Sequence, residues 1–310
     1  MALLALGASL LLGGSARAGP ITGIVSFGDS LSDVGNDFLG SGGVQPAPAA
    51  DYYHGHFSNG PIWLEYLAKD LGIAAPTPAL AGGTDYAFGG AQTGPGFSTF
   101  AGAQVPNIDT QIGMYLNAHT PNASQLFTIW GGANDVLYGS SPNPMASVTN
   151  IAGEITTLAK AGAKQFLVGN LPALNLIPAA SGLTSAQQQG LALFTQYFNQ
   201  GLQAEVAQLQ QSLGVQIHWL DVNRLFRSAI ANPNQYGFTN VTGFALNPQM
   251  SGNGYLFWDP YHPTTEAGLL IGNVAAQSVP EPSSLVLFAT ALGALFAWRP
   301  NRRCARSGPR

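Results

Sequence analysis

The sequence predicts an α/β protein whose mostly parallel central sheet is covered by helices on both faces. Apolar, β-branched runs with the length of buried strands occur at residues 21–27, 126–130, 165–168 and 215–220. Helical patterns alternate with these runs at residues 62–71, 148–161 and 184–213. Because neighbouring parallel strands are joined by a crossover that is usually a helix, this alternation favours a three-layer α/β/α sandwich.

Two elements are less sharply defined than the others. Residues 85–88 form a weaker strand candidate between the first two strong ones. The pattern at 184–213 is long and rich in Gln, and it predicts either two helices or one long helix broken near Gly201. The sequence therefore leaves open whether one helix or two precede the strand predicted at residues 215–220.

Three long stretches, residues 35–60, 76–109 and 232–254, have no strong hydrophobic period. Loops of this length inside a domain usually carry function or are poorly ordered. We therefore expect these stretches to surround the active site.

The length of 310 residues fits one domain flanked by two terminal signals. Without both signals about 260 residues remain, enough for a sizeable core. Hydrophobic residues make up 46% of the chain and charged residues 8%, a composition typical of a loop-rich exported protein rather than a disordered one. The single cysteine, Cys304, lies near the C-terminus, so the core has to form without disulfide bonds.

The N-terminus has the pattern of a secretory signal peptide. An apolar run from Met1 ends at Ser15-Ala16-Arg17-Ala18, which fits an A-x-A cleavage site. No Lys or Arg precedes the run, which departs from the usual pattern. We assign residues 1–18 to the signal peptide and residues 19–278 to the catalytic domain.

The C-terminal residues 279–310 have three parts. Val279-Pro280-Glu281-Pro282 precedes an apolar run from Leu285 to Trp298, and five arginines follow. The apolar run is shorter than the roughly 20 residues that span a bilayer comfortably, and the arginines would stay cytoplasmic. This tail resembles the PEP-CTERM sorting signal of Gram-negative bacteria, which implies recognition by a membrane-bound exosortase and transient contact with the inner membrane. The alternative is an ordinary C-terminal anchor, and both alternatives imply export.

The mature chain is acidic. Between Gly19 and Pro282 there are five Lys and Arg residues and 15 Asp and Glu residues, which gives a formal charge of −10. A surface of this charge argues against nucleic acid and anionic membranes as partners.

Four short blocks follow one another in the order that an acyl-transfer site needs. They are Gly28-Asp29-Ser30-Leu31, Gly89-Gly90-Ala91, Gly131-Gly132-Ala133-Asn134-Asp135 and Asp259-Pro260-Tyr261-His262. The first and third blocks directly follow strands, at the edge of an open α/β sheet where ligands bind. A helical turn beginning at Ser30 would also favour developing negative charge there.

The blocks offer a nucleophile, a base and a carboxylate. Ser30 can attack an acyl carbonyl if His262 takes its proton, and Asp259, three residues before His262, can hold the imidazole in the required tautomer. His119 and His218 lack such a partner in the sequence. No serine lies in a Gly-x-Ser-x-Gly elbow, which argues against the α/β-hydrolase fold.

Together the blocks resemble the GDSL (SGNH) hydrolase family of esterases and lipases, and the first block, with its neighbours from Phe27 to Asn36, resembles the secreted bacterial branch. The resemblance implies a flavodoxin-like sheet, with no cofactor or metal. It also implies an oxyanion hole formed by the backbone N–H groups of Ser30 and Gly90 and the side-chain amide of Asn134. The choice between Gly89 and Gly90 stays open, and Asp29 and Asp135 are expected to be structural.

His54 and His56 lie close to Asp51, and such a group can ligate zinc. No third strong ligand is obvious nearby, so we expect this segment to border the substrate cleft instead. Nor does the sequence contain a phosphate-binding or dinucleotide motif.

The sequence therefore predicts an exported serine esterase or lipase that hydrolyses carboxylic esters through an acyl-serine intermediate. Its substrate would be lipid-like or short-acyl. The alternatives are a deacetylase of an acetylated extracellular polysaccharide and a non-catalytic matrix-associated binding protein on the same fold. We expect the protein at the cell surface, in the extracellular matrix or in the medium.

Overall fold

Four parallel strands form the central sheet of the computed structural model, which describes residues 20–139, 143–246 and 251–279. The order is β1 (Gly23–Gly28), β4 (Gln125–Trp130), β5 (Gln165–Gly169) and β6 (Gln216–Leu220). All three pairings are parallel, with Gly28 opposite Trp130 at the carboxyl ends of β1 and β4. The four strong strand predictions agree with the structure to within about two residues at each end.

The weak strand candidate at 85–88 lies along the free edge of β1. The backbone N–H of Ser26 donates to Thr84 O at 3.0 Å, and Ser26 O accepts from Tyr86 N at 2.8 Å. One parallel bridge joins Ser26 to Asp85. This segment therefore covers the edge of β1 without forming a regular strand. Gly89 and Gly90 follow it and lie at the carboxyl end of the sheet.

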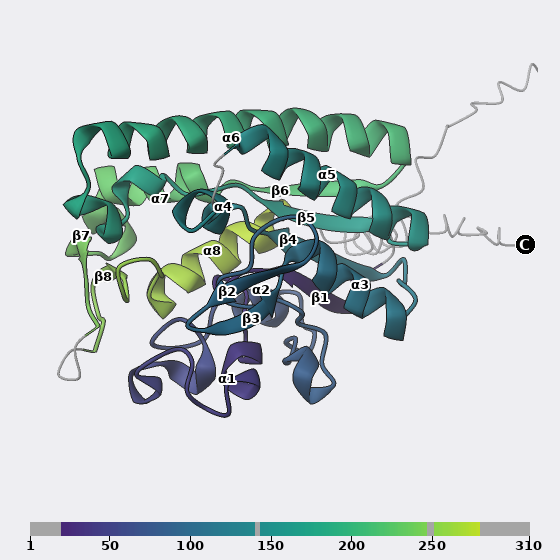
Figure 1. Cartoon of the computed structure of the whole chain (residues 1–310), viewed down its shortest axis with the longest axis horizontal. Helices are drawn as coiled ribbons and strands as arrows, with labels where there is room; N and C mark the ends of the chain where they lie inside the picture. Colours follow the sequence, from purple (N-terminus) through teal and green to yellow (C-terminus); the bar gives the residue numbers. More distant parts are fainter. Residues whose placement is uncertain (1–19, 140–142, 247–250, 280–310) are drawn as a thin grey trace, which may run out of the picture. The chain divides into compact units, whose positions relative to one another are not determined.

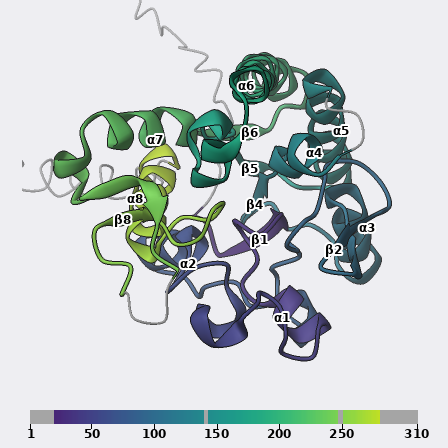
Figure 2. The same ribbon diagram turned by 60° about the vertical axis from the view of Figure 1, so that its left-hand side comes forward.

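Helices cover both faces of the sheet (Figures 1 and 2). Figure 2 shows α3 (Ile108–Ala118), α5 (Pro144–Ala161) and α6 (Ser185–Leu213) on one side of the strands, and α2 (Trp63–Asp70) and α8 (Thr265–Ser278) on the other. The inward residues of the strands, such as Phe27, Phe127 and Phe166, are fully buried between the two helical layers. The prediction of a three-layer α/β/α fold is thus confirmed.

The α6 helix is a single unbroken helix of 29 residues. It begins with a capping box, in which the Thr184 hydroxyl accepts from Gln187 N and the Gln187 side chain accepts from Thr184 N. Gly201 does not break it. A Cβ at Gly201 would come within 2.9 Å of the Met145 sulfur, so the glycine allows α6 to pack closely on α5.

Several elements were not predicted. Two short strands form a hairpin inside the stretch 76–109, β2 (Phe97–Phe100) and β3 (Ala103–Pro106), and β7 (Asn240–Phe244) pairs with β8 (Tyr255–Phe257). The unpredicted helices are α1 (Asn36–Gly40), α3, α4 (Ala133–Leu137), α7 (Val222–Ala231) and α8. Of these, α3, α4 and α7 contribute directly to the site.

The predicted signal peptide and nearly all of the predicted sorting tail lie outside the described residues. In the part of the chain that is described, no helix combines the length and apolar character needed to cross a membrane. Val279, which follows α8, is only 2% exposed and donates its N–H to Ala275 O. The hydrophobic core thus extends one residue past the end of α8.

Candidate active site

Ser30 lies two residues beyond the end of β1, at a point where the backbone is tightly held. Gln111 of α3 makes two hydrogen bonds with Gly28: its Oε1 accepts from the Gly28 N–H at 2.9 Å and its Nε2 donates to the Gly28 carbonyl at 2.8 Å. A Cβ at Gly28 would come within 2.4 Å of the Trp130 carbonyl oxygen, so glycine is required there. This role of Gln111 could not be predicted from the sequence because α3 itself was not predicted.

The segment after Ser30 is a turn and not a helix. Asp29 O accepts from the N–H groups of Ser32 and Asp33, and the Asp29 side chain accepts from Leu31 N. The first helix, α1, starts only at Asn36 and has five residues. A single helical turn therefore begins at this point, as the sequence suggested, but it does not continue into a regular helix.

Ser30, His262 and Asp259 form a continuous chain of hydrogen-bonding contacts. His262 Nε2 lies 2.7 Å from Ser30 Oγ, and His262 Nδ1 lies 2.6 Å from Asp259 Oδ2. Asp259 Oδ1 accepts from the backbone N–H groups of Tyr261 and His262, both at 2.8 Å. The loop between β8 and α8 thus places a carboxylate and an imidazole next to a serine more than 200 residues earlier in the chain.

Asp259 has a further partner, the hydroxyl of Tyr52, which donates to Oδ2 at 2.8 Å. Burial by itself would raise the pKa of Asp259. The charge and hydrogen bond of His262, the Tyr261 N–H and the Tyr52 hydroxyl together outweigh burial and hold the pKa of Asp259 below its usual value. The carboxylate therefore stays ionised beside the imidazole.

An apolar pocket, here called the Ser30 pocket, surrounds the serine and the histidine. Its apolar walls come from the ends of β4 and β8, from α4 and α7, and from the loop after β5; they include Trp130, Leu137, Leu174, Ile177, Val222, Phe226 and Phe257. Ser30 is 9% exposed, and the Phe57 ring lies 5.0 Å from the His262 ring. The serine is thus within reach of a substrate but shielded from bulk water.

Gly89 and Gly90 differ in what their backbone N–H groups contact. The Gly89 N–H donates to Asp33 Oδ2 at 3.2 Å. The Gly90 N–H, like that of Ser30, has no hydrogen-bond partner among the described residues, and both residues line the Ser30 pocket. Gly90 has a φ of +78°, and a Cβ there would lie 2.5 Å from the Phe100 Cβ, so only glycine fits.

Asn134 lies in α4, just after β4, and its side chain is also fixed. Its Nδ2 donates to the Ala91 carbonyl at 2.9 Å. A side-chain amide has two N–H donors, so one remains for a ligand in the Ser30 pocket, which Asn134 lines. Asn134 and Gly90 are therefore joined through Ala91, and the loop carrying Gly90 is linked to α4.

Asp33 organises the loops around Ser30. Its carboxylate accepts from the N–H groups of Gly35, Asn36 and Asp37 and from Gly89 N. Burial raises the pKa of Asp33 to about 6, although these four donors oppose the shift. Asp33, two residues after the first block, thus anchors residues 89–94, here called the glycine segment.

Asp29 and Asp135 have the structural roles expected from the sequence. Asp29 closes the turn after Ser30, and burial raises its pKa to about 6. Asp135 accepts hydrogen bonds from Thr93 N, Thr93 Oγ1 and Ser147 Oγ. Asp135 therefore connects the glycine segment to α4 and α5.

The segment with two histidines lies near the site without forming a metal centre. His56 Nδ1 lies 2.7 Å from Tyr53 O, and its Nε2 lies 3.3 Å from Glu65 Oε2. Within residues 20–139, 143–246 and 251–279 no group of three His, Cys, Asp or Glu side chains is arranged to hold a metal ion. His56 instead holds the loop that carries Phe57 and Tyr52.

Two of the three long stretches border the site as expected. Tyr52 and Phe57 from residues 35–60 contact Asp259 and His262, and Phe100 from residues 76–109 lines the Ser30 pocket. The third stretch was placed wrongly: none of its described residues lines this pocket. It instead forms β7, which pairs with β8 beside the triad loop.

Comparison with known proteins shows the family. A model of the GDSL-like lipase/acylhydrolase family matches residues 24–274, and a PEP-CTERM protein-sorting motif matches residues 278–303. That motif indicates export in Gram-negative bacteria.

Two relatives illustrate the range of the family. The chain is 26% identical over 306 residues to a phosphatidylcholine-sterol acyltransferase of Aeromonas hydrophila, covering 82% of this chain and 88% of that protein. It is 29% identical over 264 residues to a thermolabile hemolysin of Vibrio parahaemolyticus, covering 79% of this chain and 60% of the hemolysin.

Among solved structures, a member of the lipolytic G-D-S-L family from Veillonella parvula matches with a TM-score of 0.47 at 15% identity, covering 83% of this chain and 97% of that one. The argument for the family comes from the sequence model, which spans most of the chain, including all four blocks. The chain belongs to the GDSL-like lipase/acylhydrolase family.

Proposed function

We propose that the protein hydrolyses carboxylic esters through an acyl-Ser30 intermediate. The observation that carries the proposal is the contact chain from Ser30 Oγ through His262 to Asp259, at 2.7 and 2.6 Å. These distances are within the reach required of a nucleophile and its base. Acyl transfer to an alcohol would use the same intermediate, with the alcohol replacing water in the second step.

In the first step His262 Nε2 accepts the Ser30 proton as Oγ attacks the carbonyl carbon. Asp259 accepts the hydrogen bond of Nδ1–H, which keeps the proton of the neutral imidazole on Nδ1 and stabilises the imidazolium that forms. The C–O bond of the ester then breaks, and His262 returns the proton to the leaving alcohol. Water repeats the sequence on the acyl-enzyme and releases the acid.

The oxyanion of each tetrahedral intermediate needs donors that are already in place. We assign this role to the N–H groups of Ser30 and Gly90 and to the free N–H of the Asn134 amide. The unpaired N–H groups at the pocket support this choice. Gly89 is the weaker candidate because its N–H is already bonded to Asp33.

Relatives with related activities support ester chemistry. An acetylesterase of Thermothelomyces thermophilus is 26% identical over 297 residues, which cover 87% of this chain and 95% of that protein. The acyltransferase from Aeromonas hydrophila also works on acyl groups by its name. Both acetyl and longer acyl esters are therefore reasonable substrates to test.

We further propose that residues 1–18 are removed on export and that an exosortase-type enzyme processes the tail after transient contact with the inner membrane. The mature protein would then be in the medium, at the cell surface or in the extracellular matrix. Val279 is buried, so a truncation meant to keep the domain intact should retain it. Intact-mass analysis of the exported protein tests this part: chains that keep Arg299 to Arg310 would contradict it.

The test of the activity is hydrolysis of p-nitrophenyl esters and of an acetylated glycan by the wild type, Ser30→Ala and Ser32→Ala. Ser32 is the matched control because its buried hydroxyl has no hydrogen-bond partner in the described part of the chain. We expect Ser30→Ala to lose hydrolysis, and labelling by a serine-directed phosphonate, with an unchanged melting curve. Full activity in Ser30→Ala would refute the assignment of the nucleophile, and selective release of acetate from the glycan would favour the deacetylase alternative.

A further inference from the structure

The Ser30 pocket opens into two grooves of different chemistry. One, the apolar groove, runs between α4 and the start of α6 and has a volume of about 620 Å³. It shares Leu137, Ile177 and Tyr261 with the Ser30 pocket. The other, the hairpin groove, lies against the β2–β3 hairpin, has a volume of about 610 Å³ and shares Gly90, Phe100 and Tyr138 with the Ser30 pocket.

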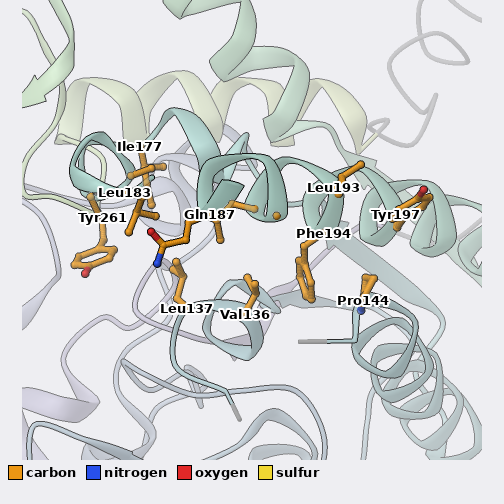
Figure 3. A pocket seen from close by; sticks show the side chains of 14 residues that line it. Val136, Leu137, Pro144, Ile177, Leu183, Gln187, Leu193, Phe194, Tyr197 and Tyr261 are labelled. Carbon is orange, nitrogen blue, oxygen red and sulfur yellow. The ribbon is translucent and has the colours of Figure 1, made fainter. Parts of the chain in front are cut away.

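Figure 3 shows the lining of the apolar groove. Val136 and Leu137 of α4 lie opposite side chains of α6 and of the segment before it, and Tyr197 and Pro144 lie at the end away from Tyr261. Nearly all of the described lining is aliphatic or aromatic; among the described residues Gln187 is its only amide, and none carries a charge. Leu193 is 42% exposed and Tyr197 53% exposed, so apolar surface on α6 faces solvent along this groove.

The hairpin groove is more polar. Gln92, Ser98, Thr99 and Asn107 contribute amide and hydroxyl groups, and again no charged side chain lines it within the part of the chain that the structure describes. Tyr138 lines both the Ser30 pocket and the hairpin groove. Its ring lies 6.1 Å from the ring of Tyr261, which lines both the Ser30 pocket and the apolar groove.

An ester extends in two directions from its carbonyl carbon, through the acyl chain and through the alcohol oxygen. We propose that the apolar groove binds the acyl chain and that the hairpin groove receives the hydroxyl-bearing alcohol, so that the substrate class is an uncharged ester of a medium or long acyl chain. This inference rests on the proposed esterase function. It follows from the matching of an aliphatic chain to an aliphatic wall and of hydroxyl groups to amides and hydroxyls.

Gly190 of α6 gives a selective way to fill the apolar groove. It lines the groove, and a Cβ built at this position meets no atom within 4 Å. Gly153 of α5 is its matched control: it is also exposed, helical and without atoms within 4 Å of a Cβ, but it lines none of the three depressions described above. A side chain can therefore start at either position without its Cβ meeting a neighbouring atom.

The experiment measures kcat/KM of the full chain for p-nitrophenyl acetate, octanoate and dodecanoate, and for dodecyl acetate, below the concentration at which they form micelles. Each methylene that enters the groove is expected to raise kcat/KM by up to about fourfold. Gly190→Trp should lower the ratio of dodecanoate to acetate activity at least tenfold, while Gly153→Trp keeps the wild-type ratio. An unchanged ratio in Gly190→Trp, or a loss confined to dodecyl acetate, would overturn the assignment of the acyl chain to this groove.

Calorimetric titration with the free dodecanoate and acetate ions needs no turnover. It therefore separates this inference from the proposed function. Wild type and Gly153→Trp should bind dodecanoate more tightly than acetate, and Gly190→Trp should lose that preference. If no ester is hydrolysed but dodecanoate binds in this way, the groove assignment stands and the proposed function fails. Equal binding of dodecanoate by all three proteins would refute the groove assignment.

Discussion

The hydroxyl of Tyr52 donates a 2.8 Å hydrogen bond to Asp259 Oδ2, the same oxygen that lies 2.6 Å from His262 Nδ1. The two residues are 207 positions apart. Tyr52 is a positioning residue because it contacts the triad carboxylate and not the reacting atoms. It shares Oδ2 with the imidazole and so fixes the side-chain rotamer from which Asp259 reaches His262.

Tyr52→Phe should lower kcat about tenfold with little change in melting temperature, because a hydrogen bond to a charged group is lost. The bond helps to keep the pKa of Asp259 low, so its removal raises that pKa, and Asp259 becomes protonated at a higher pH as the solution is acidified. The acid limb of the kcat–pH profile should therefore move to higher pH. Tyr53→Phe is the control, because no hydrogen bond of the Tyr53 hydroxyl occurs among the described residues. A profile identical to wild type would remove Tyr52 from the triad.

Asn134→Ala should lower kcat by about 10²–10³ with a much smaller change in KM, since the oxyanion exists only in the transition state and the intermediates. Asn150→Ala is the control: its amide donates to Thr93 Oγ1 at 2.9 Å and so also fixes the glycine segment, but it does not line the Ser30 pocket. The measurement is steady-state kinetics with one p-nitrophenyl ester. An effect on KM alone would mean that Asn134 binds ground-state substrate.

Gly90→Ala should reduce both activity and stability. The added methyl group strains a backbone at φ +78° and meets Phe100, so the loop has to shift and the N–H moves away from the pocket. Gly82→Ala separates the two causes, because Gly82 has φ +84° with no atom near its Cβ. We expect Gly82→Ala to cost about 1–2 kcal/mol of unfolding free energy and to keep full activity. Equal activity of the two variants would argue against Gly90 as an oxyanion donor.

Glu154→Gln tests a buried acid behind the glycine segment. Burial raises the pKa of Glu154 to about 8, from an ordinary value of 4.5, and its Oε1 accepts from Gly94 N at 3.2 Å. Between these two pH values the unfolded chain is ionised at this residue while the folded chain keeps the proton, so folding stability falls as pH rises through that window. Glutamine carries no such proton and should be increasingly stabilised relative to wild type from pH 5 to 8, as measured by urea unfolding. A difference between the two proteins that does not change with pH would contradict this assignment.

The four sheet strands and the helices α2, α5 and α6 could be predicted because each has a clear hydrophobic pattern of its own. Ser30 and Asn134 could be named as candidate site residues because they follow predicted strands, and the carboxyl ends of parallel strands meet at one edge. Hydrophobic periodicity reports only whether a segment has one buried face. The turn at Ser30 and the hairpin at 97–106 depend instead on specific hydrogen bonds, such as those from Leu31 N to Asp29 Oδ1 and from Ser98 Oγ to Asn107 Oδ1, and hydrophobic periodicity does not report these.

The sequence by itself determined the α/β class, the identity of the nucleophile, base and carboxylate candidates, and the sorting motif at the C-terminus. Only the tertiary structure decided that Gln111 fixes Gly28, that Asp33 engages Gly89 and leaves the Gly90 N–H free, and that Tyr52 bonds to Asp259. Each of these contacts joins residues at least 56 positions apart. Such contacts form because buried polar groups must find hydrogen-bond partners within the folded chain, and which partner is near depends on how the layers pack and not on the residues beside them in sequence.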